Sequence, residues 1–497
     1  MNQESNYYDV IIVGKGNAAL CAALAARDQG VRVAILEAAS VEESGGNSRF
    51  AGGVMRFAYN GLEDLKKVID LTEAEIAETD FGTNTTDEFF EDLFRLTHYK
   101  TDPELSEILV TRSLEIMVWL RSKGVKFVPN YGRQSAVVDG RKRFFGRMPV
   151  EVSGGGAGLV QFMDKAAEKA GIDIHYQTRA KSLVVEGDRV VGVRASRSGC
   201  PTVFYARSVV LACGGFEANP EMRARYLGPG WELAKVRGSR FNQGDGLRMA
   251  LDIGSAGYGN WSGAHATGWD LNAPPYGDLS VGDQFQKHSY IFGILINANG
   301  KRFVDEGLDF HSFTYAKYGG EVLKQPGQFA WQVFDSKVNK LLRSEYRIKK
   351  MTKVSANTLE ELAAKLEGVN PQEFLKTVRA YNASVRSDIS FDHTVKDGKC
   401  TEGIDPPKSN WAQLLDTPPF DAYATTCGIT FTFGGLRIDP NSGQVLDGTQ
   451  EPIPGLYCAG EMVGGLFYFN YPSGTGLVSG AVFGRLAGEN AGRAAIA

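Results

Sequence analysis

The stretch "YDVIIVGKGNAALCAALAARDQGVRVAILEAA", Tyr8–Ala39, decides the fold. It starts with a continuous apolar run, Val10 to Val13, as expected of a parallel strand that is buried on both faces. A turn at Gly14-Lys15-Gly16 follows, then an alanine-rich helix to about Gln29 and a second strand from Val31 to Leu36. This order predicts a β-α-β unit and therefore an α/β domain.

The glycine-rich turn carries the fingerprint of a dinucleotide site. Gly14 allows the tight turn, Gly16 lets the backbone approach a pyrophosphate, and Ala19 stands in the third glycine position. Glu37 follows at the end of the second strand, about 20 residues on, where a carboxylate would hold a ribose hydroxyl. The helix N-terminus is then the predicted phosphate site.

Composition narrows the class of protein. A chain of 497 residues is too long for one core and predicts two or three domains. The 54 basic and 58 acidic side chains give a net charge of −4, which argues against nucleic-acid binding and against binding to an anionic membrane. The 59 glycines cluster between apolar runs, which indicates close approach of the backbone to a ligand.

Several common sites are not expected from this sequence. The six cysteines are scattered without a C-x-x-C pair, which argues against a disulfide framework, an iron–sulfur cluster or attached haem. The histidines show no ligand spacing, so no metal site is predicted. No basic-then-apolar leader opens the sequence and no apolar run approaches the roughly 18 residues of a membrane span, so we expect a cytoplasmic protein without membrane insertion.

The segment after the acidic residue, "ESGGNSRFAGG" (Glu43–Gly53), is a second glycine-rich turn. It resembles the loop that carries flavin-adenine dinucleotide (FAD) in the fumarate reductase and succinate dehydrogenase flavoprotein family. Five further segments follow in the order of that family: "VSGGGAGLVQFMDKAAEKAG", "ARSVVLACGGFEANPEM", "NQGDGLRMALDIG", "NGKRFVDEG" and "PIPGLYCAGEMVGG". The chain is therefore identified as a member, and the resemblance covers nearly its whole length.

The resemblance implies an α/β fold, a Rossmann-like FAD-binding domain with an inserted α+β capping domain. The FAD-binding domain would comprise residues 1–255 and 426–497, and the capping domain residues 256–425. Asn47-Ser48 stand where members with covalent flavin have a histidine, so non-covalent FAD is predicted. The residues expected at the cofactor are Gly14, Gly16, Asn17, Ala18, Glu37, Gly46, Asn47, Ser48, Gly52, Gly53, Ala180, Ala212, Gly214, Gly460, Glu461, Gly476, Leu477 and Val478.

Two regions have helical periodicity. Residues 84–122 begin with a capping box, Thr85 and Glu88, and a second helical pattern runs from about Trp331 to Ser387 with a capping box at Thr358 and Glu361. A last helix is expected to start at about Thr475. No catalytic or binding role is predicted for the first two helical regions.

The substrate side departs from the family. Members that handle dicarboxylates use a histidine in an H-x-T-x-G-G segment, an arginine near the C-terminal helix, and an arginine after "NGxRFxxE" that carries the proton. This chain has Thr430 at the first position, Tyr471 after Asn470 at the second, and Phe310-His311 in the third region. The resemblance therefore argues against a plain fumarate reductase or succinate dehydrogenase.

Two branches of the superfamily fit better. The stretch "YPSGTG", Tyr471–Gly476, resembles the 3-ketosteroid dehydrogenases, in which this tyrosine and a backbone N–H hold a ketone oxygen. The chain as a whole resembles the tricarballylate dehydrogenases, a group that implies an arginine where this chain has His311. Loss of that cation favours a less anionic substrate, and the aromatic "TFTFGG" suits a ring or a flat enone.

We therefore expect Tyr471 to donate to a substrate carbonyl and His311 to carry the proton, because an imidazole has an unperturbed pKa of about 6.5. Tyr315 and Tyr318 are the reserves for the proton role. The helix start near Gly476-Leu477-Val478 would face the pyrimidine oxygen of the flavin. The residues expected to bind substrate are Thr430, Phe431, Thr432, Phe433 and Thr475.

The predicted function is that of an FAD-dependent dehydrogenase, desaturase or ene-reductase acting on a CH–CH bond next to a carbonyl. A cyclic ketone or keto acid is the favoured small-molecule substrate, and an external electron acceptor is the expected partner. A tricarballylate-type polycarboxylate dehydrogenase is the first alternative. A non-catalytic, flavin-binding redox sensor is the alternative from another class.

Overall fold

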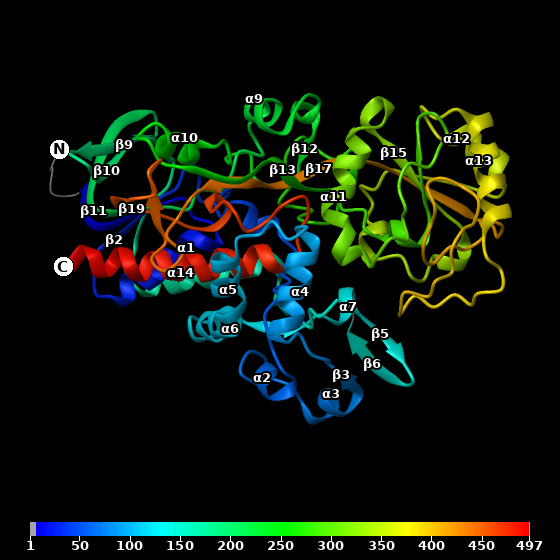
Figure 1. Cartoon of the computed structure of the whole chain (residues 1–497), viewed down its shortest axis with the longest axis horizontal. Helices are drawn as coiled ribbons and strands as arrows, with labels where there is room; N and C mark the ends of the chain where they lie inside the picture. Colours follow the sequence, from blue (N-terminus) through cyan, green and yellow to red (C-terminus); the bar gives the residue numbers. More distant parts are fainter. Residues whose placement is uncertain (1–5, 145, 497) are drawn as a thin grey trace. The chain divides into compact units, whose positions relative to one another are not determined.

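A computed structural model describes residues 6–144 and 146–496 (Figure 1). The chain forms two compact units. Unit 1 comprises residues 1–228, 238–264 and 431–497, and unit 2 comprises residues 229–237 and 265–430. The chain passes from one unit to the other at 228/229, at 237/238, within β13 (Gly257–Asp270) and within β17 (Phe420–Leu436). The domain boundaries expected after residues 255 and 425 stay predictions.

Unit 1 is built on an eight-stranded sheet, which contains the order β18-β19-β11-β1-β2-β8. The predicted β-α-β unit is confirmed as β1 (Tyr7–Val13), α1 (Asn17–Asp28) and β2 (Val33–Leu36). Strand β1 pairs in parallel with β2 and with β11 (Cys200–Leu211). The run Val10 to Val13 is buried, as expected for a central strand with both faces covered.

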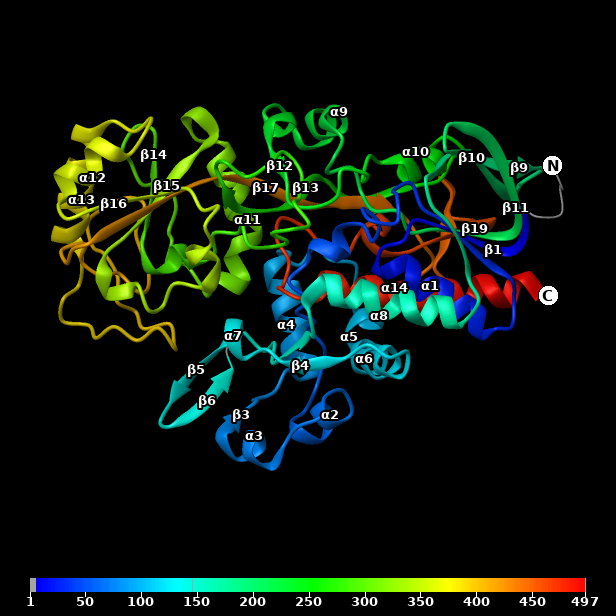
Figure 2. The same ribbon diagram turned by 180° about the vertical axis from the view of Figure 1, so that it is seen from behind.

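The first and last helices of unit 1 pack closely against each other. Helix α14 (Thr475–Ile496) begins at the predicted residue and lies alongside α1 (Figure 2). Its glycines recur every four residues and therefore share one face. A Cβ at Gly484 would overlap the carbonyl oxygen of Ala18, and one at Gly488 that of Ala22. Glycine is thus required there by the close contact between the helices.

The predicted helical segment from residue 84 is confirmed as α4 (Thr86–Leu96), α5 (Pro103–Thr111) and α6 (Ser113–Ser122). The Thr85–Glu88 capping box is present. The other elements of unit 1 are α2 (Leu62–Lys66), α3 (Glu73–Glu78), β3 (Thr79–Asp80), β4 (Phe127–Pro129), α7 (Tyr131–Gln134), β5 (Ser135–Val138), β6 (Arg141–Phe144), β7 (Val150–Val152), α8 (Gly155–Lys169), β8 (Asp173–His175), β9 (Thr178–Glu186), β10 (Arg189–Arg197), α9 (Pro220–Met222), α10 (Asp245–Leu251), β18 (Gln444–Leu446) and β19 (Pro452–Cys458).

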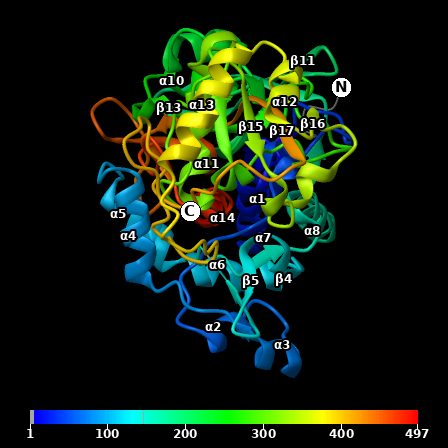
Figure 3. The ribbon, with the colours of Figure 1, turned by 90° about the vertical axis from the view of Figure 1, so that its right-hand side faces the viewer.

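Unit 2 contains a mainly antiparallel arrangement of β14 (Ile294–Asn297), β15 (Ala330–Phe334), β16 (Lys353–Ala356) and β17, with β12 (Lys235–Val236) parallel to β17. Helices α12 (Leu359–Lys365) and α13 (Pro371–Ser384) pack against these strands through a shared apolar core (Figure 3). Unit 2 also contains helix α11 (His311–Leu323).

The helical pattern expected from Trp331 is wrong before Leu359, because β15 and β16 occupy part of that region. Short apolar runs fit a buried strand and a buried helix equally well, and the sheet partners decide between them. The capping box at Thr358 is only partly as predicted. Thr358 accepts from the Glu361 amide at 3.1 Å, whereas Glu361 accepts from the amide of Asn357, one residue earlier.

Candidate cofactor pocket and catalytic clusters

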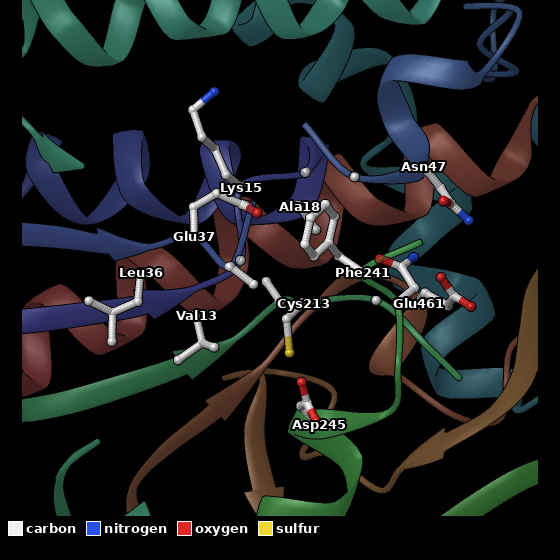
Figure 4. A pocket seen from close by; sticks show the side chains of 18 of the residues that line it. Val13, Lys15, Ala18, Leu36, Glu37, Asn47, Cys213, Phe241, Asp245 and Glu461 are labelled. Atoms are coloured by element: carbon white, nitrogen blue, oxygen red, sulfur yellow. The ribbon is translucent and has the colours of Figure 1, made fainter. Parts of the chain in front are cut away.

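A cavity in unit 1 opens beside the N-terminus of α1 and the carboxyl ends of β1 and β2 (Figure 4). It holds about 810 Å³ of empty space, part of it open to solvent. Asn47 and Glu461 lie toward one end and Val13 and Leu36 toward the other. The predicted cofactor residues that line it are Gly14, Gly16, Asn17, Ala18, Glu37, Gly46, Asn47, Ser48, Ala180, Ala212, Gly214, Gly460 and Glu461.

The first glycine turn has no room for a side chain. Gly14 has a φ of 103°, and a Cβ there would lie 2.5 Å from the carbonyl oxygen of Ala212. The adjoining start of α1 is tied to two other segments. Asn17 donates from its backbone N–H to Ser48 Oγ at 3.0 Å and from Nδ2 to the Leu477 carbonyl at 2.7 Å. The nucleotide turn, the second glycine-rich loop and the first turn of α14 are therefore one hydrogen-bonded assembly.

Glu37 is buried at the end of β2, where its Oε1 accepts from the Ala39 amide at 2.7 Å. Burial raises the pKa of this carboxyl. The Lys15 ammonium is also buried and lies 2.5 Å from Asp164 Oδ1. Figure 4 places the side chains of Lys15 and Glu37 next to each other in the pocket wall.

The sequence analysis missed several residues that line the cavity: Lys15, Thr178, Arg179, Cys213, Phe241, Asn242 and Asp245. Arg179 Nε donates to Asp245 Oδ2 at 2.6 Å, which pairs β9 with the start of α10. Asp245 lies in the quoted segment "NQGDGLRMALDIG", so its family resemblance was the available signal. Nothing in the local pattern distinguishes Arg179 or Phe241 from ordinary surface residues.

Other predicted cofactor residues do not line this cavity. Gly52 and Gly53 lie against the start of α8, where a Cβ at Gly53 would be 2.5 Å from Gly155 Cα. Gly476, Leu477 and Val478 form the first turn of α14 and reach the cavity wall through the Asn17–Leu477 hydrogen bond.

The residues present fit an FAD molecule. A turn with no space for a Cβ brings the backbone against a phosphate site at a helix N-terminus, and a buried carboxyl stands where a ribose would lie. At the start of α14 the hydroxyl of Thr475 is buried, and it has no hydrogen-bond partner in the described part of the chain. An orphaned buried hydroxyl is rare unless a ligand satisfies it.

Tyr471 belongs to an aromatic cluster in unit 1, which we define as Phe431, Phe433, Phe467 and Tyr471. The Tyr471 ring makes edge contacts with Phe431 at 5.3 Å and Phe467 at 5.4 Å between centroids. A Cβ at Gly476 would lie 3.8 Å from both Phe431 and Tyr471, so the cluster adjoins the first turn of α14. Thr432 points elsewhere, because its amide and hydroxyl donate to Glu461 Oε1 at 2.8 and 3.2 Å.

A second cluster lies in unit 2 and consists of His265, His288, His311, Tyr315 and Arg343. Arg343 Nη1 lies 2.7 Å from His311 Nε2, and Arg343 Nε lies 3.2 Å from Glu345. The rings of His265 and His288 lie 4.9 and 4.7 Å from that of Tyr315. Burial lowers the pKa of both His265 and His288 well below its ordinary value. We call this group the histidine cluster.

The remaining predicted site residues also lie in unit 2. Thr430 accepts from Arg237 Nη1 at 3.3 Å, and Arg237 forms a two-pronged ion pair with Asp283 at 2.7 and 2.9 Å. Tyr318 donates its hydroxyl proton to the backbone carbonyl of Asp305, and burial raises its pKa strongly. This arrangement favours packing over proton transfer for Tyr318.

Within the described ranges, 6–144 and 146–496, no group of three or more potential ligands could hold a metal ion, and no helix is long and apolar enough to cross a membrane. The described cysteines are all free thiols.

The chain is similar to known flavoproteins over almost its whole length. Residues 9–477 match the FAD binding domain family. A probable fumarate reductase of Shewanella frigidimarina is 31% identical over 98% of this chain and 75% of the relative. A 3-oxosteroid 1-dehydrogenase of Mycobacterium tuberculosis is 26% identical over 97% of each chain.

A solved structure also shows that the chain is similar to flavoproteins. The open conformation of a flavocytochrome c3 fumarate reductase superposes with a TM-score of 0.75 at 28% identity, covering 99% of this chain and 79% of that one. The cofactor is thus FAD, and the chain is an FAD-dependent oxidoreductase acting on CH–CH groups. The match of family, fold and pocket establishes that the chain belongs to the fumarate reductase and succinate dehydrogenase flavoprotein family.

Proposed function

We propose that this enzyme forms or reduces a C=C bond next to a carbonyl in a cyclic ketone or keto acid. The observation that carries the proposal is the buried phenol of Tyr471, held among phenylalanine rings beside the first turn of α14. A phenol in a site of low dielectric is a strong donor to an oxygen that gains negative charge. The match to a steroid dehydrogenase over nearly the full length of both chains supports a ketone substrate.

Bound FAD would supply hydride acceptor chemistry at its N5 atom. Gly14, Gly16 and Asn17 would hold its phosphates and Glu37 a ribose hydroxyl. Tyr471 would donate to the substrate carbonyl oxygen and so make the neighbouring C–H more acidic. The rings of the aromatic cluster would exclude water and pack against a flat apolar substrate.

His311 would take up or supply the proton of the carbon next to the carbonyl, while the hydride is exchanged at the other carbon of the bond. Arg343 Nη1 lies 2.7 Å from His311 Nε2 and so positions the ring for this step. Tyr315 and Tyr318 remain reserve candidates, with Tyr318 the weaker of the two because its proton is engaged by Asp305.

The charges near these residues favour a ketone over a tricarboxylate. Arg237 is paired with Asp283, and Arg343 lies beside Glu345. Guanidinium groups with carboxylate partners already in place attract a polyanion less than unpaired ones. Tricarballylate therefore serves as the competing substrate class in the test, and an external electron acceptor completes the proposed cycle.

The test is anaerobic bleaching of the purified holoprotein, followed at the flavin absorbance band, with a panel of cyclic ketones and keto acids against tricarballylate and succinate. The proposal predicts bleaching by one or more carbonyl compounds. Bleaching by tricarballylate alone would overturn the substrate class. A yellow protein that no C–H acid reduces, and that no enone reoxidises after dithionite reduction, would support a non-catalytic redox sensor.

Tyr471→Phe tests the residue that carries the proposal. Removing one such donor costs about 10²–10³ in kcat, whereas FAD content is expected to be unchanged, because Tyr471 does not line the cofactor cavity. Tyr468→Phe is the matched control, since Tyr468 lies outside the aromatic cluster. Normal turnover of the Tyr471 variant would show that this assignment is wrong.

A further inference from the structure

Glu217 is a fully buried carboxyl group directly behind the cofactor cavity. It follows the "CGGF" turn at the end of β11 and does not itself line the cavity. Its side chain nevertheless contacts three residues that do. Those three residues come from segments of unit 1 that are far apart in the sequence: Asn47, Asn242 and Glu461.

The hydrogen bonds of Glu217 divide between its two oxygens. Oε1 accepts from Asn47 Nδ2 at 2.7 Å and also from Asn242 Nδ2. The orientation of the Asn47 amide is fixed independently, because its Oδ1 accepts from the Ser239 backbone N–H at 2.7 Å. Oε2 is buried and receives no hydrogen bond from a donor in the described residues, and the carboxyl of Glu461 is its ionisable neighbour. Two amide donors on one oxygen leave Glu217 Oε2 for Glu461.

The partners of Glu461 locate the proton in this bond. Glu461 Oε1 accepts from the amide and hydroxyl of Thr432 at 2.8 and 3.2 Å, and the nearby Gly215 amide also favours the ionised form of this carboxyl by lowering its pKa. A carboxyl that receives several donors is stabilised as the carboxylate. Two carboxyl groups in contact cannot both be ionised, so one shared proton is required. Glu217 Oε2 is the position that remains for it.

The surroundings agree with this assignment. Burial and the neighbouring Glu461 carboxyl both raise the pKa of Glu217. Arg223 is a nearby cation, and its Nη1 donates to the backbone carbonyl of Glu217 at 2.5 Å. The neighbouring ionisable side chain that raises the pKa of Glu217 is that of Glu461.

We propose that Glu217 is a positioning residue of the FAD site: as a neutral carboxylic acid it donates to Glu461, accepts from Asn47 and Asn242, and so fixes three side chains of the cavity wall. The inference deepens the assignment of FAD and does not depend on the substrate. The crowding of the turn fits this role, because a Cβ at Gly214 would lie 2.6 Å from Asn242 Nδ2. The Asn242 side chain therefore packs directly on the turn.

Two variants separate the neutral acid from other roles. Glu217→Gln reproduces the proposed bonds, since its amide oxygen can accept from both asparagines and its NH₂ can donate to Glu461. Glu217→Leu has similar bulk but leaves the Glu461 carboxylate and both amides without that partner. Glu221→Gln, at an exposed position nearby, is the control.

The readout is FAD affinity of the full chain, measured by flavin fluorescence between pH 6 and pH 10. We expect Glu217→Gln to bind within about threefold of the wild type at pH 7, and Glu217→Leu to bind at least about tenfold more weakly. Wild-type affinity should fall at high pH, where the shared proton is lost and two carboxylates repel each other. The glutamine variant should show a smaller fall, because its amide does not titrate while other cavity groups such as Glu37 still do.

Each opposite result overturns the proposal. Loss of FAD binding in Glu217→Gln would mean that the ionised carboxylate is required. Normal binding by Glu217→Leu would mean that Glu217 positions nothing. A pH profile of Glu217→Gln that matches the wild type would remove the shared proton from the argument, and it is decisive even where the leucine variant does not fold.

Discussion

The cofactor cavity of unit 1 and the histidine cluster of unit 2 bury opposite kinds of ionisable groups. The carboxyl groups of Glu37 and Glu461 line the cavity, and that of Glu217 lies behind its wall. Burial raises the pKa of each. The histidine cluster contains His265 and His288, and burial lowers the pKa of both. Burial thus favours the neutral form in both regions.

The two regions also use different parts of the chain. The cavity is shaped by backbone at positions such as Gly14, where any side chain would collide with Ala212. The histidine cluster is made of side chains that residues distant in sequence bring together, and Arg343 lies beside the proposed proton carrier His311. A site made of backbone tolerates little variation, whereas a site made of side chains can change substrate by substitution. The four predictions below test this contrast, from the largest expected effect to the smallest.

Gly14→Val should abolish FAD binding, because the new side chain would overlap Ala212 and distort the phosphate turn. The measurement is the ratio of flavin to protein absorbance after purification and reconstitution. Gly448→Val is the control, since nothing lies within 4 Å of a Cβ at that residue. A yellow Gly14→Val protein would show that the turn does not determine cofactor binding.

His311→Asn should lower turnover by about 10²–10⁴, the usual contribution of a general acid or base. FAD content should be unchanged, because His311 lies in unit 2 and does not line the cavity. Stopped-flow bleaching of the flavin by an active ketone gives the rate. If Tyr315→Phe costs more than His311→Asn, the proton role belongs to the tyrosine.

Gly488→Val should destabilise unit 1 by about 1–3 kcal/mol, the usual effect of an overfilled contact. The valine would overlap the Ala22 carbonyl where α14 packs on α1. Urea denaturation followed by circular dichroism measures the change, with Gly448→Val again as the reference. A variant as stable as the reference would mean that the helices can separate at no cost.

Acidification should weaken unit 2 through its buried histidines. Since the folded-state pKa of His288 lies below its unfolded value of about 6.5, its contribution is complete above that pH and is lost as the pH falls from there toward the folded pKa. The slope is at most about 1.4 kcal/mol per pH unit for one proton. Urea titrations of the wild type and His288→Gln at pH 7.5 and pH 5.5 measure it.

The glutamine variant should lose less stability than the wild type between these two pH values. His98→Gln, at an exposed position, should behave as the wild type. Equal losses in the wild type and the His288 variant would contradict a neutral buried imidazole at this position.

The sequence by itself determined the β-α-β unit, the FAD family and the start of the last helix at Thr475. Each depends on a local pattern: an apolar run, glycines at fixed spacing, or a loop of small residues before a helical segment. These patterns act within a few residues of the chain, so they can be read without knowing any distant contact.

Only the tertiary structure decided which side chains surround these motifs. The strands β15 and β16 replaced an expected helical pattern because sheet partners across unit 2 fix their conformation. The contacts of Glu217 with Asn47, Asn242 and Glu461 join four segments that no local pattern relates. A shared proton or an ion pair depends on distances between segments remote in sequence, and folding alone sets those distances.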